Sequence, residues 1–266
     1  MNALPRLGAW IASGSFAAIE IAAKEDVSFF VIDAEHGAID ESTLNAVIPL
    51  VHSYGKEVLV KVRAPERASI QRALDFGANG VIIPHIQGTA HAREVCGYAK
   101  FPPLGDRSLA AERALGYGSL TPEWIADQDR SIKCYPMIED ESALLEIEQI
   151  VALPVVDGVF PGPSDLAIRR GRGCYERTED DFADIRRIAD ACKAAGKSWI
   201  LPAWSEQEQE LAINNGAHGI VVANEYTALS NGFAGLVSAA KSRFARTSCL
   251  SPTVSAEHPG GRAPDR

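Results

Sequence analysis

The sequence predicts an α/β fold in which a single (β/α)8 barrel takes up most of the chain. Short runs rich in β-branched and aromatic residues alternate with segments whose apolar residues recur at helical spacing, and this alternation repeats eight times. No block contains strands alone, which favours parallel strands joined by helices. The length of 266 residues is close to the roughly 250 that such a barrel needs. A doubly wound open sheet is the alternative, but the sequence has no GxGxxG after its first strand and no GxxxxGK[ST] anywhere.

The predicted strands are short and mostly apolar, as expected of parallel strands buried on both faces. The second, VSFFVID, is continuous in apolar residues, whereas the third, EVLVKVR, alternates with a period of two. If the three valines of the third strand pack on the helices, Lys61 and Arg63 point into the barrel, with Arg63 at its mouth. The eight predicted strands cover residues 7–11, 27–33, 57–63, 80–84, 132–138, 155–160, 198–201 and 218–222.

The predicted helices follow from amphipathic spacing and from glycine at their ends. Gly77 and Gly196 close two of them, as is usual just past a helix C-terminus. The last helix has an apolar face rich in small residues. The predicted helices cover residues 16–24, 42–54, 68–76, 89–99, 143–151, 181–194, 206–214 and 229–244.

Two stretches depart from this alternation. Residues 100–131 hold consecutive prolines, several glycines and one predicted short helix at 122–128. A connection of this length inside a compact domain is usually functional or at an interface, so we expect it to cover the active mouth or to form a subunit contact. From Thr247 onward the chain is polar and rich in proline and glycine. We therefore expect a barrel domain at residues 1–246 and a disordered tail at 247–266.

Composition excludes several classes of protein. The net charge of −9 argues against a general partner of nucleic acids or of anionic membranes. No apolar run approaches the roughly 20 residues needed to cross a bilayer, and the first residues do not read as a signal peptide. The five cysteines are scattered, with no CxxC spacing, and are expected to be free thiols in a reducing compartment. We expect a cytoplasmic protein.

Polar residues follow four of the predicted strands, at the barrel edge where ligands bind. Glu139 follows the fifth strand and Asp165 the sixth. Acids at such positions often cap helices, but two together suit a divalent cation with oxygen ligands, Mg²⁺ or Mn²⁺. Asp33 and His36 follow the second strand, and Arg63 ends the third. Their convergence on one rim is a stronger signal than any single residue.

These residue types together suit the formation of an enolate next to a carbonyl. A histidine beside a carboxylate can act as a general base, and an arginine can stabilise an enolate oxygen or bind a carboxylate. A divalent metal polarises a keto oxygen. Backbone N–H groups around Gly162 to Asp165, at a possible helix start, can hold a substrate carboxylate.

Five segments carry a resemblance to a known family: FFVIDAEHGAID, VKVRAPERASIQRALDFGANGVIIPHIQ, KFPPLGDRS, MIEDESALLEIEQI and DGVFPGPSDLA. The IDxEH and GPSDL blocks are the most diagnostic. On these segments the chain resembles the HpcH/HpaI aldolase family of metal-dependent class II pyruvate aldolases, which act on 2,4-dihydroxyhept-2-ene-1,7-dioate and 2-keto-3-deoxy sugar acids. The similarity runs from Leu7 to about Phe244, nearly the whole chain.

The resemblance implies a metal site and a base. Glu139 and Asp165 would bind the metal, Mg²⁺ or Mn²⁺ with Co²⁺ as a further candidate. His36, paired with Asp33, would be the base that acts on the pyruvate methyl through a bound water. Arg63 would hold the keto or enolate oxygen.

The resemblance also implies a substrate and an assembly. The backbone at Gly162 and the Ser164 N–H would bind the substrate carboxylate. The reaction would be reversible cleavage of a 4-hydroxy-2-oxoacid into pyruvate, or a close 2-oxoacid, and an aldehyde. The family also suggests a homohexamer, a trimer of dimers, in which the helix at 229–244 is exchanged between neighbouring subunits.

Two departures from the family pattern leave alternatives open. Met137 stands where family members usually carry Gln, and Lys61 stands where they commonly have an apolar residue. A lysine inside a barrel can form a Schiff base with a keto substrate without a metal, although a lysine that pairs with an inward acid is the favoured interpretation. A barrel that binds an oxoacid or a sugar acid without turnover is the second alternative; the set of His, Arg, Glu and Asp argues against it. His85 and Trp204 follow strands on the same rim and are weaker candidates for substrate contact.

Overall fold

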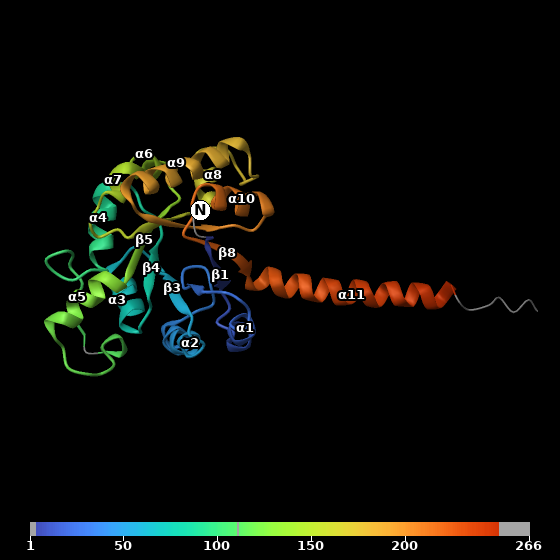
Figure 1. Cartoon of the computed structure of the whole chain (residues 1–266). Helices are drawn as coiled ribbons and strands as arrows, with labels where there is room; N and C mark the ends of the chain where they lie inside the picture. Colours follow the sequence, from blue (N-terminus) through green and yellow to red (C-terminus); the bar gives the residue numbers. More distant parts are fainter. Residues whose placement is uncertain (1–3, 111, 250–266) are drawn as a thin grey trace, which may run out of the picture. The chain divides into compact units, whose positions relative to one another are not determined.

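The computed structural model describes residues 4–110 and 112–249. Its strands are all parallel and close into a barrel in sequence order, because β1 pairs with both β2 and β8 (Figure 1). The predicted (β/α)8 fold, a TIM barrel, is therefore confirmed, and the open sheet is excluded. The strands are β1 (Arg6–Ile11), β2 (Phe29–Asp33), β3 (Glu57–Lys61), β4 (Gly80–Ile83), β5 (Lys133–Ile138), β6 (Gly158–Pro161), β7 (Ser198–Pro202) and β8 (Gly219–Asn224).

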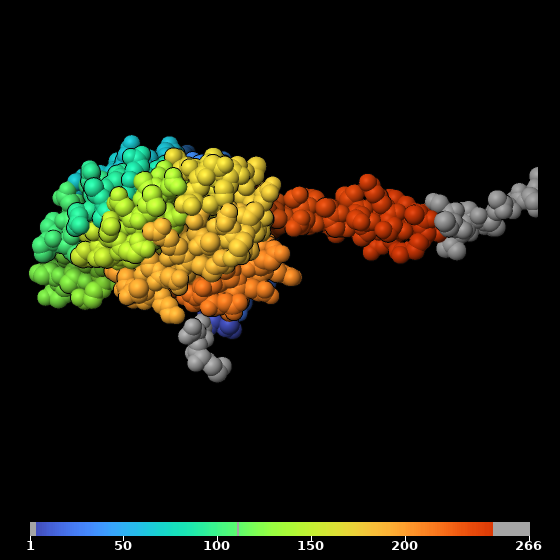
Figure 2. Space-filling model, turned by 90° about the horizontal axis from the view of Figure 1, so that it is seen from above, coloured from blue at the N-terminus to red at the C-terminus, as the bar shows by residue number. Residues whose placement is uncertain are grey.

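Helices surround the strands, and on the face shown in Figure 2 those coloured green to orange cover the barrel. The helix predicted at 143–151 is two short helices separated at Glu146, whose carboxylate accepts the Thr89 N–H at the start of α4. The helices are α1 (Phe16–Ala22), α2 (Glu41–Ser53), α3 (Arg67–Asp75), α4 (Thr89–Gly97), α5 (Pro122–Ser131), α6 (Glu141–Leu145), α7 (Ile147–Val151), α8 (Pro163–Arg169), α9 (Glu179–Ala195), α10 (Glu206–Asn214) and α11 (Glu225–Cys249).

Two apolar layers hold the barrel together. The outer layer lies between strands and helices and includes Val58 and Val60, as the alternation in β3 predicts. Leu59 points the other way, into the lumen, and so does Lys61 two residues later. The lumen is filled by a separate cluster: Phe29, Val31, Leu59, Ile82, Tyr135, Met137, Phe160, Ile200 and Val221.

The two ends of the segment 100–131 are held together at the N-terminal end of the barrel. Lys100 is buried there, and its Nζ donates to the carbonyl oxygens of Asp129 and Ile132 at 2.7 Å each. The same Nζ lies 2.9 Å from a carboxylate oxygen of Asp157, which comes just before β6. The middle of the segment runs along two helices: Asp106 and Ser108 meet α3 at Arg67 and Gln71, and Arg113 meets α2 at Asn45. A cover over the mouth therefore stays a prediction. The alternative, a subunit contact, stays a prediction.

Helix α11 is longer than the predicted helix at 229–244. Its exposed side chains include Leu229, Phe233, Leu236 and Val237, whose spacing of three to four residues places them along one side of the helix. The first three residues of the predicted tail still belong to this helix, whereas 250–266 lie outside the described residues. The domain boundary at 246 and the exchange of this helix between subunits stay predictions.

Two structural findings concern membrane insertion and the cysteines. Within the part of the chain that is described, no helix combines the length and the apolarity needed to cross a bilayer. Cys96, Cys134 and Cys192 are buried free thiols, and Cys174 is an exposed one.

Candidate functional site

The loop after β2 is folded around Asp33. One oxygen of its buried carboxylate accepts the backbone N–H groups of Glu35 (3.1 Å) and His36 (3.0 Å), and the other accepts the Trp10 indole N–H at 3.2 Å. The structure thus joins Asp33 to His36 through the His36 backbone rather than through its ring. The His36 side chain is 65% exposed, and its Nε2 lies 3.5 Å from a carboxylate oxygen of Glu35.

Glu35 is the residue at this rim that sequence reasoning missed. Its side chain is 8% exposed and reaches two further strands: one carboxylate oxygen lies 2.6 Å from Lys61 Nζ and the other 2.6 Å from His85 Nε2. The prediction that Lys61 pairs with an inward acid is therefore confirmed, and that acid is Glu35. The available signal was the IDxEH block itself, which places Glu35 just past a strand neighbouring β3.

Glu139, after β5, is buried and held by the loop after β4. Its carboxylate accepts the His85 backbone N–H at 2.6 Å and lies 3.2 Å from His85 Nδ1. Burial raises the pKa of Glu139, the His85 N–H and the nearby Lys61 oppose this increase, and the Asp165 charge adds to it.

The turn between β6 and α8 comes against Glu139 because residue 162 has no side chain. A Cβ on Gly162 would lie 2.8 Å from Glu139 Cβ and 2.8 Å from Met137 Cε. The Gly162 N–H donates to the Ile138 carbonyl at 2.9 Å, which fixes the turn to the end of β5. Ser164 and Asp165 follow in the exposed first turn of α8. The predicted metal and carboxylate residues therefore come from two adjoining loops.

Arg63 lies beyond the end of β3, which stops at Lys61. Its guanidinium is 3.4 Å from the Ile39 carbonyl oxygen, and its side chain lines a small cavity of about 130 Å³ that Arg72 also lines. Among the described residues it makes no hydrogen bond or ion pair with Glu139 or His36. The role of Arg63 in holding an enolate oxygen stays a prediction.

Aromatic side chains complete the rim. Trp10 lies with its ring centroid 6.0 Å from that of Phe160 and 6.4 Å from that of Trp204, the second contact edge-on at 79°. Lys61 Nζ is 5.9 Å from the centroid of the Trp10 ring. Trp204 is 42% exposed and follows β7, so it stays a candidate for contact with a ligand.

The acids at this rim fit one class of metal ion. In the described residues, no three or more histidine, cysteine, aspartate or glutamate side chains are arranged to hold a metal. Glu139 and Asp165 alone do not make a closed site of the Zn²⁺ type. Two carboxylates do suit Mg²⁺, which usually keeps several waters and binds one or two protein carboxylates.

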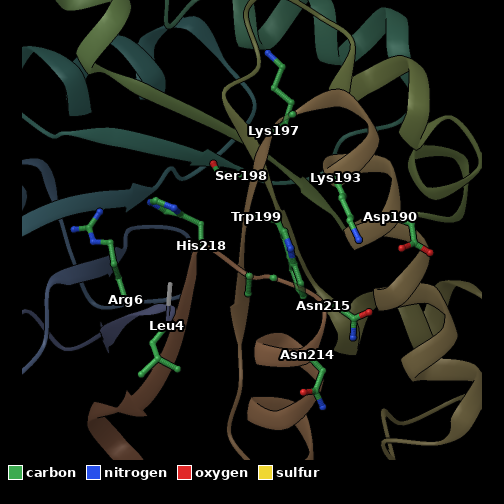
Figure 3. A pocket seen from close by; sticks show the side chains of 13 residues that line it. Leu4, Arg6, Asp190, Lys193, Lys197, Ser198, Trp199, Asn214, Asn215 and His218 are labelled. Atoms are coloured by element: carbon green, nitrogen blue, oxygen red, sulfur yellow. The ribbon is translucent and has the colours of Figure 1, made fainter. Parts of the chain in front are cut away.

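A larger hollow, of about 610 Å³, lies at the opposite end of the barrel. Figure 3 shows Arg6 and His218 on one side of it and Lys193, Asp190 and Asn215 on the other. Arg6 begins β1 and His218 immediately precedes β8, so this hollow faces the N-terminal ends of the strands. It is separate from the rim that carries Glu35 and Glu139.

The chain is similar to several known proteins over most of its length. Residues 6–231 match the family model described as HpcH/HpaI aldolase/citrate lyase. The 2-dehydro-3,6-dideoxy-6-sulfogluconate aldolase of Pseudomonas putida is 32% identical over 191 residues, 71% of this chain and 74% of that protein. The 2-keto-3-deoxy-L-rhamnonate aldolase of Shigella dysenteriae serotype 1 is 29% identical over 208 residues, 76% of this chain and 78% of that protein. The crystal structure of an HpcH/HpaI aldolase from Desulfitobacterium hafniense DCB-2 superposes with a TM-score of 0.83 at 26% identity, covering 90% of this chain and 93% of that one.

Proposed function

Because the chain belongs to the HpcH/HpaI aldolase/citrate lyase family, we propose that it is a metal-dependent aldolase acting on a 4-hydroxy-2-oxoacid. The products are pyruvate, or a close 2-oxoacid, and an aldehyde, and the reaction is reversible. Its relatives named as aldolases of a sulfogluconate and of a rhamnonate support a 2-keto-3-deoxy sugar acid as the substrate class. The observation that carries the proposal is the buried Glu139, packed against the glycine turn that leads to Asp165.

Glu139 and Asp165 would hold the divalent cation, Mg²⁺ or Mn²⁺ with Co²⁺ as a third candidate. When bound, the cation supplies Lewis-acid polarisation of the substrate keto oxygen. The protein's part is to hold Glu139 in place, which the His85 N–H does at 2.6 Å. Gly162 leaves the space that this geometry requires.

The remaining residues bind the oxoacid and move its proton. The Ser164 N–H, at the start of α8, would receive the substrate carboxylate. The predicted part of the Gly162 backbone in this contact is not supported, because its N–H already donates to the Ile138 carbonyl at 2.9 Å. His36, exposed at the mouth, would take a proton from the pyruvate methyl. The hydrogen bond from Arg63 to the Ile39 carbonyl is long, at 3.4 Å, and therefore weak. Arg63 would give up this bond and turn towards the keto oxygen. Asp33 would keep the loop that carries His36 in shape.

The Schiff-base alternative is less well supported. A nucleophilic lysine must lose its proton, and buried lysines do so when they are desolvated without a partner. Lys61 instead lies 2.6 Å from the buried Glu35 carboxylate, so it is not the lysine without a partner that this route requires. A barrel that binds an oxoacid or sugar acid without turnover is the other alternative, and binding alone would not need the histidine at the mouth.

The decisive experiment is a coupled assay for pyruvate release on a panel of 4-hydroxy-2-oxoacids, with Mg²⁺, Mn²⁺ and Co²⁺ in turn. We expect turnover that EDTA removes and that added metal restores. Turnover that resists EDTA, together with trapping of Lys61 by borohydride and pyruvate, would establish the Schiff-base route instead. If no substrate of the panel releases pyruvate although the protein measurably binds pyruvate, the protein is a binding protein and not an aldolase.

We further propose a homohexamer, a trimer of dimers, in which α11 is exchanged between neighbouring subunits. The exposed apolar side chains Phe233 and Leu236 support a partner for this helix. Light scattering on the intact chain and on a chain ending at Glu225 tests it. A single monomeric species of the intact chain would refute the assembly. A cytoplasmic location and the absence of nucleic-acid and membrane partners stay predictions.

A further inference from the structure

One carboxylate at the candidate site lies within reach of three cationic or titratable side chains. Glu35 Oε1 is 2.6 Å from His85 Nε2, and Oε2 is 2.6 Å from Lys61 Nζ and 3.5 Å from His36 Nε2. These partners come from the end of β3, the loop after β4 and the loop after β2. A carboxylate this buried needs such partners, because an unpaired buried charge is costly.

Among the described residues, the carboxylate within ion-pair distance of a His36 ring nitrogen is that of Glu35 and not that of Asp33. The two oxygens of Asp33 already accept two backbone N–H groups and the Trp10 indole N–H. Glu35 Oε2 differs, since among the described residues no donor meets it in hydrogen-bond geometry, although the Lys61 ammonium is adjacent. The remaining lone pair of Oε2 is therefore available to His36, whose Nε2 needs to move by about half an ångström to form an ordinary hydrogen bond.

We propose that Glu35 is the positioning residue of this site: its carboxylate orients the His36 ring, while Lys61 and His85 hold that carboxylate in place. The inference rests on the proposed function, in which His36 takes the methyl proton. An exposed imidazole samples several ring orientations, and a fixed acceptor at Nε2 restricts it to one. The hydrogen bond would place the proton on Nε2 and leave Nδ1 as the basic nitrogen that faces the substrate.

A purely structural role for Glu35 makes a different prediction. In that case Glu35 only neutralises the buried Lys61, and removing both charges together would restore the site. Replacing a buried ion pair by neutral groups of similar size is often close to neutral for stability, whereas removing one partner is costly. The double variant Glu35→Gln with Lys61→Met therefore separates a structural role from a positioning role.

The test measures exchange of the pyruvate methyl protons into deuterium oxide by NMR, with Mg²⁺ or Mn²⁺ present, together with thermal unfolding. For Glu35→Gln we expect kcat for exchange to fall about 10²-fold, the usual effect of a misplaced catalytic group, with KM for pyruvate unchanged. For the double variant we expect the melting temperature to recover while exchange stays slow. Recovery of exchange in the double variant, or unchanged exchange in Glu35→Gln, would overturn the proposal.

A matched control comes from a second buried acid. Glu208 is 1% exposed and pairs with Arg177 at 3.1 Å, outside the rim cluster. Glu208→Gln is expected to lower the melting temperature and to leave methyl exchange at the wild-type rate. Loss of exchange in Glu208→Gln as large as that in Glu35→Gln would show that any buried acid matters equally, which contradicts a specific role for Glu35.

A second measurement needs no variant of Glu35. The ¹⁵N shifts of the His36 ring in the wild-type protein, assigned by their loss in His36→Gln, report which nitrogen carries the proton. We expect the Nε2–H tautomer in the neutral ring; the Nδ1–H tautomer would overturn the proposal. If the wild-type protein exchanges no methyl protons of any 2-oxoacid with any of the metals, the proposed function fails and the inference with it. Normal exchange that does not depend on Glu35 removes the inference alone.

Discussion

Replacing Gly162 by alanine tests how closely the two acid-bearing loops must approach. The added Cβ would lie 2.8 Å from Glu139 Cβ, 2.8 Å from Met137 Cε and 3.1 Å from Glu139 Oε2. The Met137 methyl can move aside, but Glu139 Cβ is fixed to the backbone directly after β5. Gly162 has φ −111° and ψ 76°, so alanine meets no left-handed strain there. Any loss must therefore come from crowding against Glu139.

The magnitude follows from the cost of overpacking a well-filled site, roughly 1–3 kcal/mol. At about 2–4 °C per kcal/mol for a domain of this size, the melting temperature should fall by about 2–12 °C. The same displacement of Glu139 should weaken Mg²⁺ or Mn²⁺ binding, measured by titration calorimetry. Gly118→Ala is the control, because its Cβ would meet nothing nearer than 3.4 Å. Equal stability and equal metal affinity in Gly162→Ala and the wild type would refute the proposed packing of the turn on Glu139.

Three further predictions concern the frame around the site. Lys100→Met should destabilise the protein by roughly 3–5 kcal/mol in urea unfolding, because it leaves the Asp157 carboxylate without its buried cation; a loss below about 1 kcal/mol would contradict this. Burial raises the pKa of Cys192 to about 12, so mass spectrometry after brief alkylation at neutral pH should find label on the exposed Cys174 first and little on Cys192. Hydrogen bonds from Thr89 lower the pKa of Glu146 below its ordinary value of 4.5. The Glu146 carboxylate therefore stabilises the fold at pH values above 4.5, and this stabilisation is lost as the pH falls through the lowered pKa. Glu146→Gln should therefore show a weaker loss of stability on acidification than the wild type, and parallel acid-unfolding curves would count against this cap.

The barrel itself was predictable because its strands are continuous apolar runs set between amphipathic helices. The position of such a run does not depend on side-chain rotamers. The predicted strand bounds therefore agree with the observed ones to within a few residues. The difference that matters for the site is at β3, which ends at Lys61, where its ladder to β2 stops, two residues short of Arg63. The ends of residues 100–131 also followed from topology, since a helix-to-strand connection returns to the N-terminal end, whereas the cover suggested by the length of the segment stays a prediction.

The site was predictable only as a set of residues on one rim. Sequence order places Glu139 and Asp165 on adjoining loops, but it does not say which carboxylate meets which ring. That choice depends on turns and rotamers: Asp33 is used by the backbone of its own loop, and Glu35 reaches across to Lys61 instead. A difference of two residues within the IDxEH block thus decides which acid lies beside the His36 ring.

The plug of side chains inside the barrel has a kinetic consequence. Phe29 and Tyr135 are among the residues that fill the lumen below the rim. A molecule bound above them can therefore enter and leave only through the mouth of the barrel. In a cleavage that yields two fragments, the fragment nearer the mouth has to depart before the deeper one can follow. The order in which the two products leave would then depend on how deep each lies in the barrel, and not on which of them binds more tightly.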